Sequence, residues 1–215
     1  MISTYIQASA FVFWDFDGVI KDSVDVKTRA FSSLFLPYGI EVAKRVRAHH
    51  EANGGVSRFE KIPLYLEWAG LSVTEDRVNT FCRRFSDLVL QAVIESPWVP
   101  GAKEYLMKFH QTQYFVLVSA TPEAEIQQII KRLGIAHYFR EVYGAPRHKA
   151  DSIAAVLSRG DCDKTNALMV GDAETDLLAA KANDIPFLLR RTAINKPLQE
   201  AYAGPSFKDF SKWTD

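Results

Sequence analysis

The chain has 215 residues, of which 47% are hydrophobic and 24% are charged. This length and balance are typical of a globular protein that forms one medium domain with an insertion or two small domains, and they exclude a disordered or fibrous chain. Because 26 basic residues balance 26 acidic ones, no overall field favours nucleic acid or an anionic membrane surface. We therefore expect neither nucleic acid nor a membrane as a partner.

The cysteines and the N-terminal segment indicate the compartment. Cys82 and Cys162 lie far apart and belong to no CxxC or Cys/His cluster, so a disulfide or zinc site has little support. The N-terminus has no basic region, and its short apolar stretch is interrupted by Asp15, which predicts neither a signal peptide nor a membrane span. We expect a cytoplasmic protein.

The first predicted element is a buried strand at residues 11–14, and it ends in two carboxylates. Asp15 and Asp17 follow it in the segment Asp15-Phe16-Asp17-Gly18-Val19-Ile20. One carboxylate can attack phosphorus and a second can protonate the departing oxygen, provided that a cation reduces the repulsion between them. Taken alone, the segment is equally typical of an Asx-rich turn with Gly18 at positive φ.

Residues 21–96 show no strand pattern and predict an inserted helical unit. Its clearest helix has apolar residues at helical spacing over 78–93, with a capping box from Ser72 to Glu75. Two earlier helices are predicted around 24–35 and 59–69, and Pro63 should kink the second or delay its start. We therefore divide the chain into an α/β core, residues 1–20 and 97–215, and a helical cap, residues 21–96.

The remaining elements alternate between strand and helix. Apolar runs predict strands at 114–118, 167–170 and 187–189, and a weaker one at 141–143. Helices are predicted from an N-cap at Thr121, with Pro122 first in the helix, to Gly134, and from Lys149 to Gly160. Unbroken apolar strands separated by helices indicate an α/β fold with a Rossmann-like parallel sheet flanked by helices.

Polar side chains follow several of these strands. Ligands of open parallel sheets bind beyond the carboxyl ends of the strands, so residues distant in sequence can meet there. Each residue alone has a structural explanation, as a hydroxyl at a helix entry, a solvated lysine or a carboxylate at a helix N-terminus. Together, and in this order, they indicate one reaction site. The group comprises Asp15, Asp17, Ser119, Lys149, Asp172 and Asp176.

On these residues the chain resembles the haloacid dehalogenase superfamily of phosphotransferases, with a helical cap of the C1 type inserted after the first strand. Its four motifs resemble Asp15 to Ile20, Ser119, Lys149, and Gly171-Asp172 with Asp176. Pro100-Gly101 resembles the return from cap to core in phosphoglycolate-phosphatase-like members. Gly55-Val56-Ser57-Arg58 resembles a cap segment of β-phosphoglucomutase-like members, in which the arginine holds the distal phosphate of the substrate.

The resemblance implies a role for each residue. Asp15 would be the nucleophile that forms an aspartyl-phosphate, and Asp17 the acid and then the base. Lys149 and Ser119 would bind the phosphoryl oxygens, and Arg58 would contact the substrate. Magnesium is the implied cofactor, with metal ligands from Asp15, the backbone carbonyl of Asp17, Asp172, and Asp176 nearby or through water.

The predicted function is that of a magnesium-dependent phosphatase acting on a small phosphorylated metabolite. Asp17 argues against carbon–halogen and carbon–phosphorus cleavage, because members with those reactions do not need an acid there. Sugar phosphomutase is the alternative: Arg58 favours it, whereas the absence of a histidine from 22–36 disfavours it. A non-catalytic phosphate-binding module is a further alternative.

The sequence leaves the substrate and the oligomeric state open. It also leaves open the role of His49 and His50, which lie near Lys44, Arg45 and Arg47. This segment is either a cationic edge for an acidic substrate or an exposed helix face.

Overall fold

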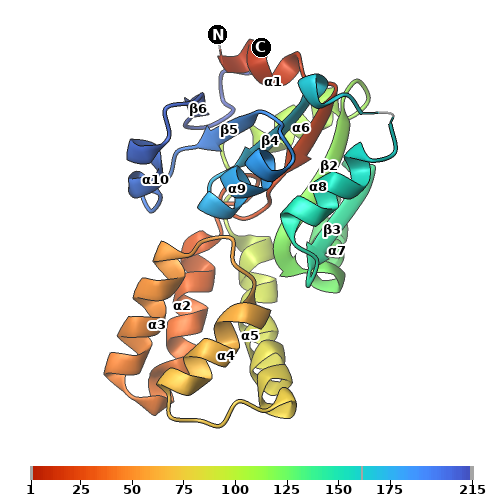
Figure 1. Ribbon diagram of the computed structural model, residues 1–215. Helices are drawn as coiled ribbons and strands as arrows, with labels where there is room; N and C mark the ends of the chain where they lie inside the picture. Colours follow the sequence, from red (N-terminus) through yellow and green to blue (C-terminus); the bar gives the residue numbers. More distant parts are fainter. Residues whose placement is uncertain (1, 161, 214–215) are drawn as a thin grey trace.

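A six-stranded parallel sheet forms the core of the protein (Figure 1). The structure is a computed structural model that describes residues 2–160 and 162–213. The strand order is β3-β2-β1-β4-β5-β6, which confirms the predicted α/β class. The strands are β1 (Phe11–Trp14), β2 (Tyr114–Pro122), β3 (Glu141–Ala145), β4 (Ala167–Gly171), β5 (Phe187–Arg190) and β6 (Ser206–Phe207).

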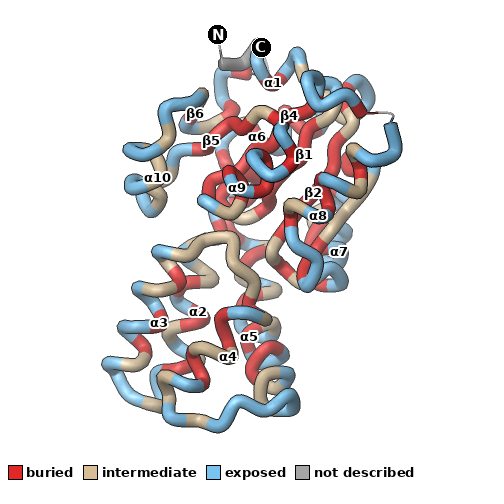
Figure 2. The backbone as a smooth tube through the Cα atoms, in the orientation of Figure 1, coloured by how far each residue is buried: buried red, intermediate tan, exposed pale blue. Residues whose placement is uncertain are grey.

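Helices cover both faces of this sheet. Successive strand residues point to opposite sides, so both faces carry apolar side chains that the helices bury. Trp14, Phe115 and Val170 belong to one apolar cluster, whereas Phe13, Val116 and Met169 belong to the other. Figure 2 shows the buried strands between exposed helix surfaces. The core helices are α1 (Ile2–Gln7), α6 (Ala102–Phe109), α7 (Glu123–Arg132), η2 (Ala136–Tyr138), α8 (Lys149–Leu157), η3 (Lys164–Asn166), α9 (Glu174–Ala182) and α10 (Lys196–Ala201).

The inserted residues form a helical bundle beside the carboxyl ends of the central strands, at the bottom of Figure 1. The bundle is held by aromatic packing, in which Phe31 stacks on Phe85 with ring centroids 3.8 Å apart and Tyr65 contacts Phe31 and Phe35 edge-on. We call this bundle the cap. Its helices are α2 (Val24–Phe35), η1 (Leu36–Tyr38), α3 (Ile40–Ala52), α4 (Arg58–Trp68) and α5 (Glu75–Glu95).

Several local predictions were wrong. Strand β2 continues through Thr121, and Pro122 caps α7, so Thr121 is not the N-cap. Helix α4 begins at Arg58 with Pro63 inside it, so the proline does not delay its start. The N-cap of α5 is Thr74, whose hydroxyl accepts from the Arg77 N–H, and not Ser72. No pattern had predicted α1, α10 or β6.

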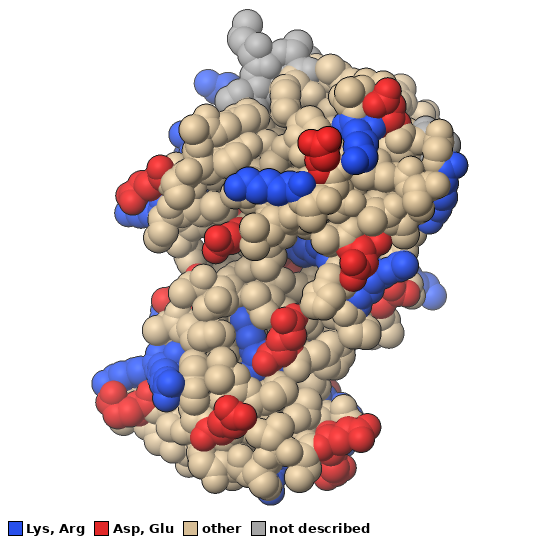
Figure 3. Space-filling view, viewed as in Figure 1, with Lys and Arg blue, Asp and Glu red and all other residues tan. Residues whose placement is uncertain are grey.

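The surface carries charges of both signs. On the face seen in Figure 3, basic and acidic side chains alternate, and no extended patch of one sign is visible. Within residues 2–160 and 162–213, no helix combines the length and apolar character that a membrane crossing requires.

Candidate active site

The loop after β1 is bound to the end of β4. The Asp15 N–H donates to the Val170 carbonyl at 3.0 Å, which places Asp15 beside the strand that leads to Asp172. Gly18 has φ +76°, and a Cβ there would lie 2.1 Å from Asp172 Oδ2. Glycine is therefore required both by the turn and by the close approach of Asp172. In a sheet of this order, the point between β1 and β4 is where ligands bind.

Lys149 connects carboxylates from two other strand ends. Its ammonium lies 2.8 Å from Asp15 Oδ1 and 2.6 Å from Asp176 Oδ1. The second oxygen of Asp176 accepts from the N–H groups of Asp172 at 3.2 Å and Ala173 at 3.0 Å. Asp176 thus holds Lys149 and also orders the loop after β4.

Three buried carboxylates form an oxygen-rich group that fits a hard divalent cation. Asp15, Asp172 and Asp176 each offer an oxygen, and these atoms lie within 4.8 Å of one another. Burial raises the pKa of Asp15 to about 7, with further contributions from Asp176 and Asp17. Burial and Asp15 also raise the pKa of Asp172 well above its ordinary value. Carboxylates that repel one another in this way are suited to Mg²⁺.

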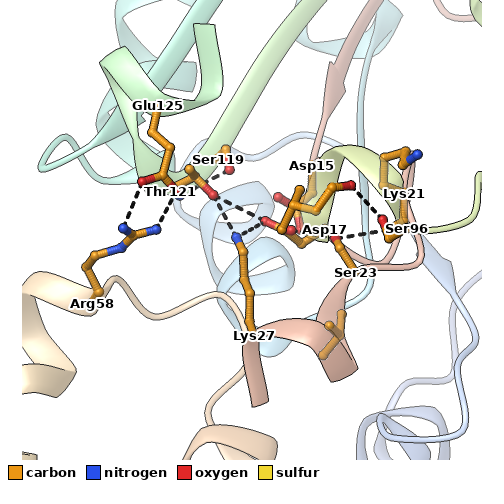
Figure 4. Close-up of polar contacts among 12 residues, drawn as sticks. Asp15, Asp17, Lys21, Ser23, Lys27, Arg58, Ser96, Ser119, Thr121 and Glu125 are labelled. Atoms are coloured by element: carbon orange, nitrogen blue, oxygen red, sulfur yellow. Dashed lines mark hydrogen bonds and ion pairs between the residues drawn. The ribbon is translucent and has the colours of Figure 1, made fainter. Parts of the chain in front are cut away.

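Asp17 points to a different set of partners (Figure 4). Although burial favours its neutral form, the charge and hydrogen bond of Lys27 and the Ser23 hydroxyl lower the pKa of Asp17 below its ordinary value. Ser23 donates to Asp17 Oδ1 at 2.6 Å, and Lys27 forms an ion pair with Oδ2. Lys27 also donates to the Thr121 hydroxyl at 2.8 Å.

Two residues of this site were missed by the sequence reasoning, Lys27 and Thr121. Thr121 lies two positions after Ser119 on β2, and this proximity could have identified it. The pairing of β2 with β3 shifts register between Val118 and Pro122, so the regular alternation of side chains does not hold there. Ser119 is buried and accepts from the Thr121 N–H at 3.1 Å, whereas Thr121 lines the cleft. Lys27 lies one turn after Ser23, within the apolar stripe of α2. A lysine among apolar residues at this position indicates a candidate site residue.

A cleft of about 910 Å³ lies between the cap and the carboxyl ends of the strands. Asp15, Asp17 and Asp172 line it from the core, and Lys27 and His50 line it from the cap. The cap loop before α4 reaches the core at Gly55, which has φ +79°. A Cβ on Gly55 would lie 2.0 Å from Thr175 Oγ1, so the loop can sit this close only with glycine.

Arg58, expected to contact substrate, is paired within the protein. Its guanidinium donates to both carboxylate oxygens of Glu125, on core helix α7, at 2.6 and 2.8 Å, and to Ser86 on α5 at 2.5 Å. Arg58 and Glu125 are both buried. Arg58 lines the cleft but joins the cap to the core, as Figure 4 shows.

His49 and His50 differ in their surroundings. His49 Nδ1 lies 3.0 Å from the Tyr65 hydroxyl. His50 is buried, lines the cleft, and has its Nδ1 2.9 Å from Lys61 Nζ. The interpretation of this pair as an exposed helix face is therefore wrong for His50.

Comparison with known proteins defines the class. A family model described as haloacid dehalogenase-like hydrolase matches residues 12–189. A phosphoglycolate phosphatase from Vibrio parahaemolyticus is 34% identical over 179 residues, covering 79% of this chain and 78% of the relative. The chain therefore belongs to the haloacid dehalogenase-like hydrolase family. With two other curated relatives the match spans only 39% and 65% of the relative's length.

Solved structures share the fold. A β-phosphoglucomutase from Clostridium difficile has a TM-score of 0.73 at 20% identity, covering 95% of this chain and 92% of that chain. A protein from Haemophilus somnus, described as a predicted phosphoglycolate phosphatase, has a TM-score of 0.72 at 20% identity, covering 95% and 96%. At this identity the likeness concerns the fold alone.

Proposed function

We propose that the protein is a magnesium-dependent phosphatase that hydrolyses a phosphate monoester of a small metabolite through an aspartyl-phosphate on Asp15. The observation that carries the proposal is the contact of Lys149 with both Asp15 and Asp176, beside Asp172, at the ends of β1 and β4. This arrangement supplies a nucleophile and fixed positive charge at one point of the cleft.

Proton transfer is assigned to Asp17. In the first step an oxygen of Asp15 attacks phosphorus, the ester bond breaks, and Asp17 protonates the leaving oxygen. In the second step Asp17 takes a proton from the water that attacks phosphorus, the bond between phosphorus and Asp15 breaks, and inorganic phosphate leaves with the Asp15 carboxylate restored. Lys27 favours the ionised Asp17 that the second step requires. An incoming phosphoryl dianion raises the pKa of Asp17 and so favours the protonated form for the first step.

Asp15 and Asp172 would hold Mg²⁺ through their side chains, and Asp17 through its backbone carbonyl. Both oxygens of Asp176 already accept hydrogen bonds, so Asp176 would act through Lys149 and the loop, or through a bound water. When bound, the ion neutralises the charge that a phosphate brings to these carboxylates. Lys149 and the hydroxyls of Ser119 and Thr121 would orient the phosphoryl oxygens.

The names of the relatives make phosphoglycolate the first substrate to test. The buried thiol of Cys82, which is in no disulfide among the described residues, is consistent with a cytoplasmic location. A phosphomutase is the alternative function, and it would need a cationic group for a second phosphate. The pairing of Arg58 with Glu125 argues against Arg58 in that role.

The test is release of inorganic phosphate from a panel of esters, with Mg²⁺ and with EDTA. The panel contains phosphoglycolate, sugar phosphates, nucleotides and an aryl phosphate. We expect Mg²⁺-dependent release that Asp15→Asn abolishes. Conversion of a sugar 1-phosphate to its 6-phosphate without release would establish the mutase instead, and release that continues in EDTA or in Asp15→Asn would refute the proposal.

A further inference from the structure

Lys61 is a buried lysine whose polar partner is an imidazole. It lies on α4 with 1% of its surface exposed, and its ammonium is 2.9 Å from His50 Nδ1 on α3. Among the residues that the structure describes, no carboxylate lies within ion-pair distance of Lys61. Burial and the charge of Lys27 lower the pKa of Lys61 to about 7.

Other buried cations of the described chain have different partners. Arg58 pairs with Glu125, and Lys149 pairs with two aspartates. Lys21 also lacks a carboxylate, but its ammonium donates to the Ile94 carbonyl at 3.0 Å and lies over the Trp98 ring. Because a buried ammonium without a counter-charge is unfavourable by several kcal/mol, an anion that reached this part of the cleft would stabilise the charged form of Lys61.

His50 connects Lys61 to the cleft. The ring of His50 lines the cleft next to Phe31, with ring centroids 4.8 Å apart. When the Lys61 ammonium donates to Nδ1, the ring proton of His50 is on Nε2. The hydrogen bond of the His50 ring to a described residue is made at Nδ1, and the ring lines the cleft, so Nε2–H is available as a donor to a cleft ligand.

The charges around this donor favour an anion. Lys27 lines the same cleft and is close enough for its charge to lower the pKa of both His50 and Lys61. The carboxylate of Glu51 also lines the cleft, but it forms an ion pair with Arg47 at 2.9 Å. Lys27 is itself paired with Asp17, so the cation on the cap side of the cleft with which no carboxylate of the described residues pairs is Lys61, which lies behind His50.

We propose that His50, Lys61 and Lys27 form an anion subsite in the cap, which binds a second anionic group, a carboxylate or a phosphate, on the organic part of the substrate. This inference rests on the proposed phosphatase function and specifies its substrate class. His50 Nε2–H donates to the anion. Lys61 is a positioning residue that fixes the tautomer of His50 and supplies charge from behind it.

The first test compares substrates that differ only in the second anion. Phosphoglycolate is paired with ethyl phosphate, and 1,3-propanediol bisphosphate with propyl phosphate. In Lys61→Met, we expect the kcat/KM ratio of one pair to fall about tenfold, through KM, which corresponds to about 1.4 kcal/mol. If the phosphoglycolate pair is affected, the subsite binds a carboxylate; if the bisphosphate pair is affected, it binds a phosphate.

The matched control is Lys44→Met, on the exposed side of α3, where Lys44 pairs with Glu41. It removes the same charge from the cap, and both ratios should stay as in the wild type. If the ratios of Lys61→Met equal those of Lys44→Met, Lys61 has only a structural role and the subsite is refuted.

A second measurement uses the wild-type protein and needs no turnover. The ¹⁵N resonances of the His50 ring are followed during titration with glycolate against glycolamide, and with 3-hydroxypropyl phosphate against 1,3-propanediol. We expect a shift with the anionic member of one pair and not with its counterpart; no shift in either pair overturns the inference. A shift in a protein that hydrolyses no ester would support the subsite while refuting the phosphatase.

Discussion

The ion pair between Lys27 of α2 and Asp17 of the loop after β1 joins the cap to the proposed acid–base residue of the core. Because Lys27 belongs to the cap helix α2, its contacts with Asp17 and with Thr121 depend on where that helix lies against the strands. The protonation of Asp17 is thus coupled to the position of the cap. Closure of a loop or domain over a cleft is a common means of completing a site around bound substrate.

Replacing Lys27 tests this coupling. Lys27→Met removes the charge that lowers the pKa of Asp17, so the pKa of Asp17 should rise. The acid limb of the kcat profile should then move to higher pH, because Asp17 must be ionised to accept a proton from water. We expect kcat at neutral pH to fall about ten- to hundredfold, which does not exceed the roughly hundred- to ten-thousandfold contribution of an acid–base group, because Asp17 itself remains.

Arg29→Met is the control for Lys27. Arg29 lies on the same helix, is exposed and pairs with Asp25. Its replacement should leave the pH profile unchanged, and an unshifted acid limb in Lys27→Met would contradict the role of Lys27.

The pair Arg58–Glu125 should stabilise the closed arrangement of cap and core. Arg58→Met and Glu125→Gln each leave the partner charge buried, so each should lower the free energy of unfolding by about 3–5 kcal/mol. The double variant leaves neither charge and should be less destabilised than the sum of the two. Urea unfolding of the four proteins measures this cycle, and additive effects would show that the two residues do not interact.

Gly55 should be required for the cap loop to reach the core. Gly55→Ala places a side chain at φ +79° and 2.0 Å from Thr175 Oγ1, so we expect kcat/KM to fall about tenfold as roughly 1–2 kcal/mol of strain opposes closure. Gly54→Ala is the matched control, because a Cβ there meets Ala173 at an ordinary 3.7 Å. Equal activities of the two variants would refute this contact.

The contribution of Asp15 to the stability of the metal-free protein should fall as the pH rises. The pKa of Asp15 is raised from 3.8 to about 7, so the folded state binds its proton more tightly than the unfolded chain. This contribution is fully present below pH 4 and is lost as the pH rises to about 7.

Magnesium should reverse that loss, because it binds the ionised carboxylates of the folded state. At about a hundred times its dissociation constant, Mg²⁺ adds about 2.7 kcal/mol, or a Tm increase of about 5–10 °C for a chain of this length. Differential scanning fluorimetry with and without Mg²⁺ measures this Tm increase at pH 7, and the same measurement at pH 4 is the comparison. An equal effect of Mg²⁺ at both pH values would contradict binding to these carboxylates.

The sequence was sufficient for strands β1 to β5 of the sheet and for grouping the polar residues that follow them. Runs such as Phe11–Trp14 are apolar on both faces, so their strand character did not depend on distant context. Asp15, Lys149 and Asp172 could be grouped because the carboxyl ends of parallel strands share one edge. Strand β6 has two residues and helix α1 has six, too few for a periodic pattern.

The cap side of the cleft was less predictable, because it depends on tertiary pairing. The residues next to Arg58 in the sequence do not indicate that Glu125, on core helix α7, pairs with its charge. In the sequence, His50 and Lys61 resemble ordinary polar residues of exposed helix faces. In the structure, Lys61 belongs to the buried side of α4, with Arg58, Ile62 and Tyr65. A lysine at such a position was the available signal.

Chemical trapping of the phosphorylated residue tests the central assignment most directly. The protein is quenched during turnover of a phosphate ester with Mg²⁺ and treated with borohydride, which reduces an acyl phosphate to an alcohol. Peptide mass analysis should then find homoserine at position 15 in the wild type and none in Asp15→Asn. Steady release of phosphate without homoserine at position 15, or homoserine at another aspartate, would contradict Asp15 as the nucleophile.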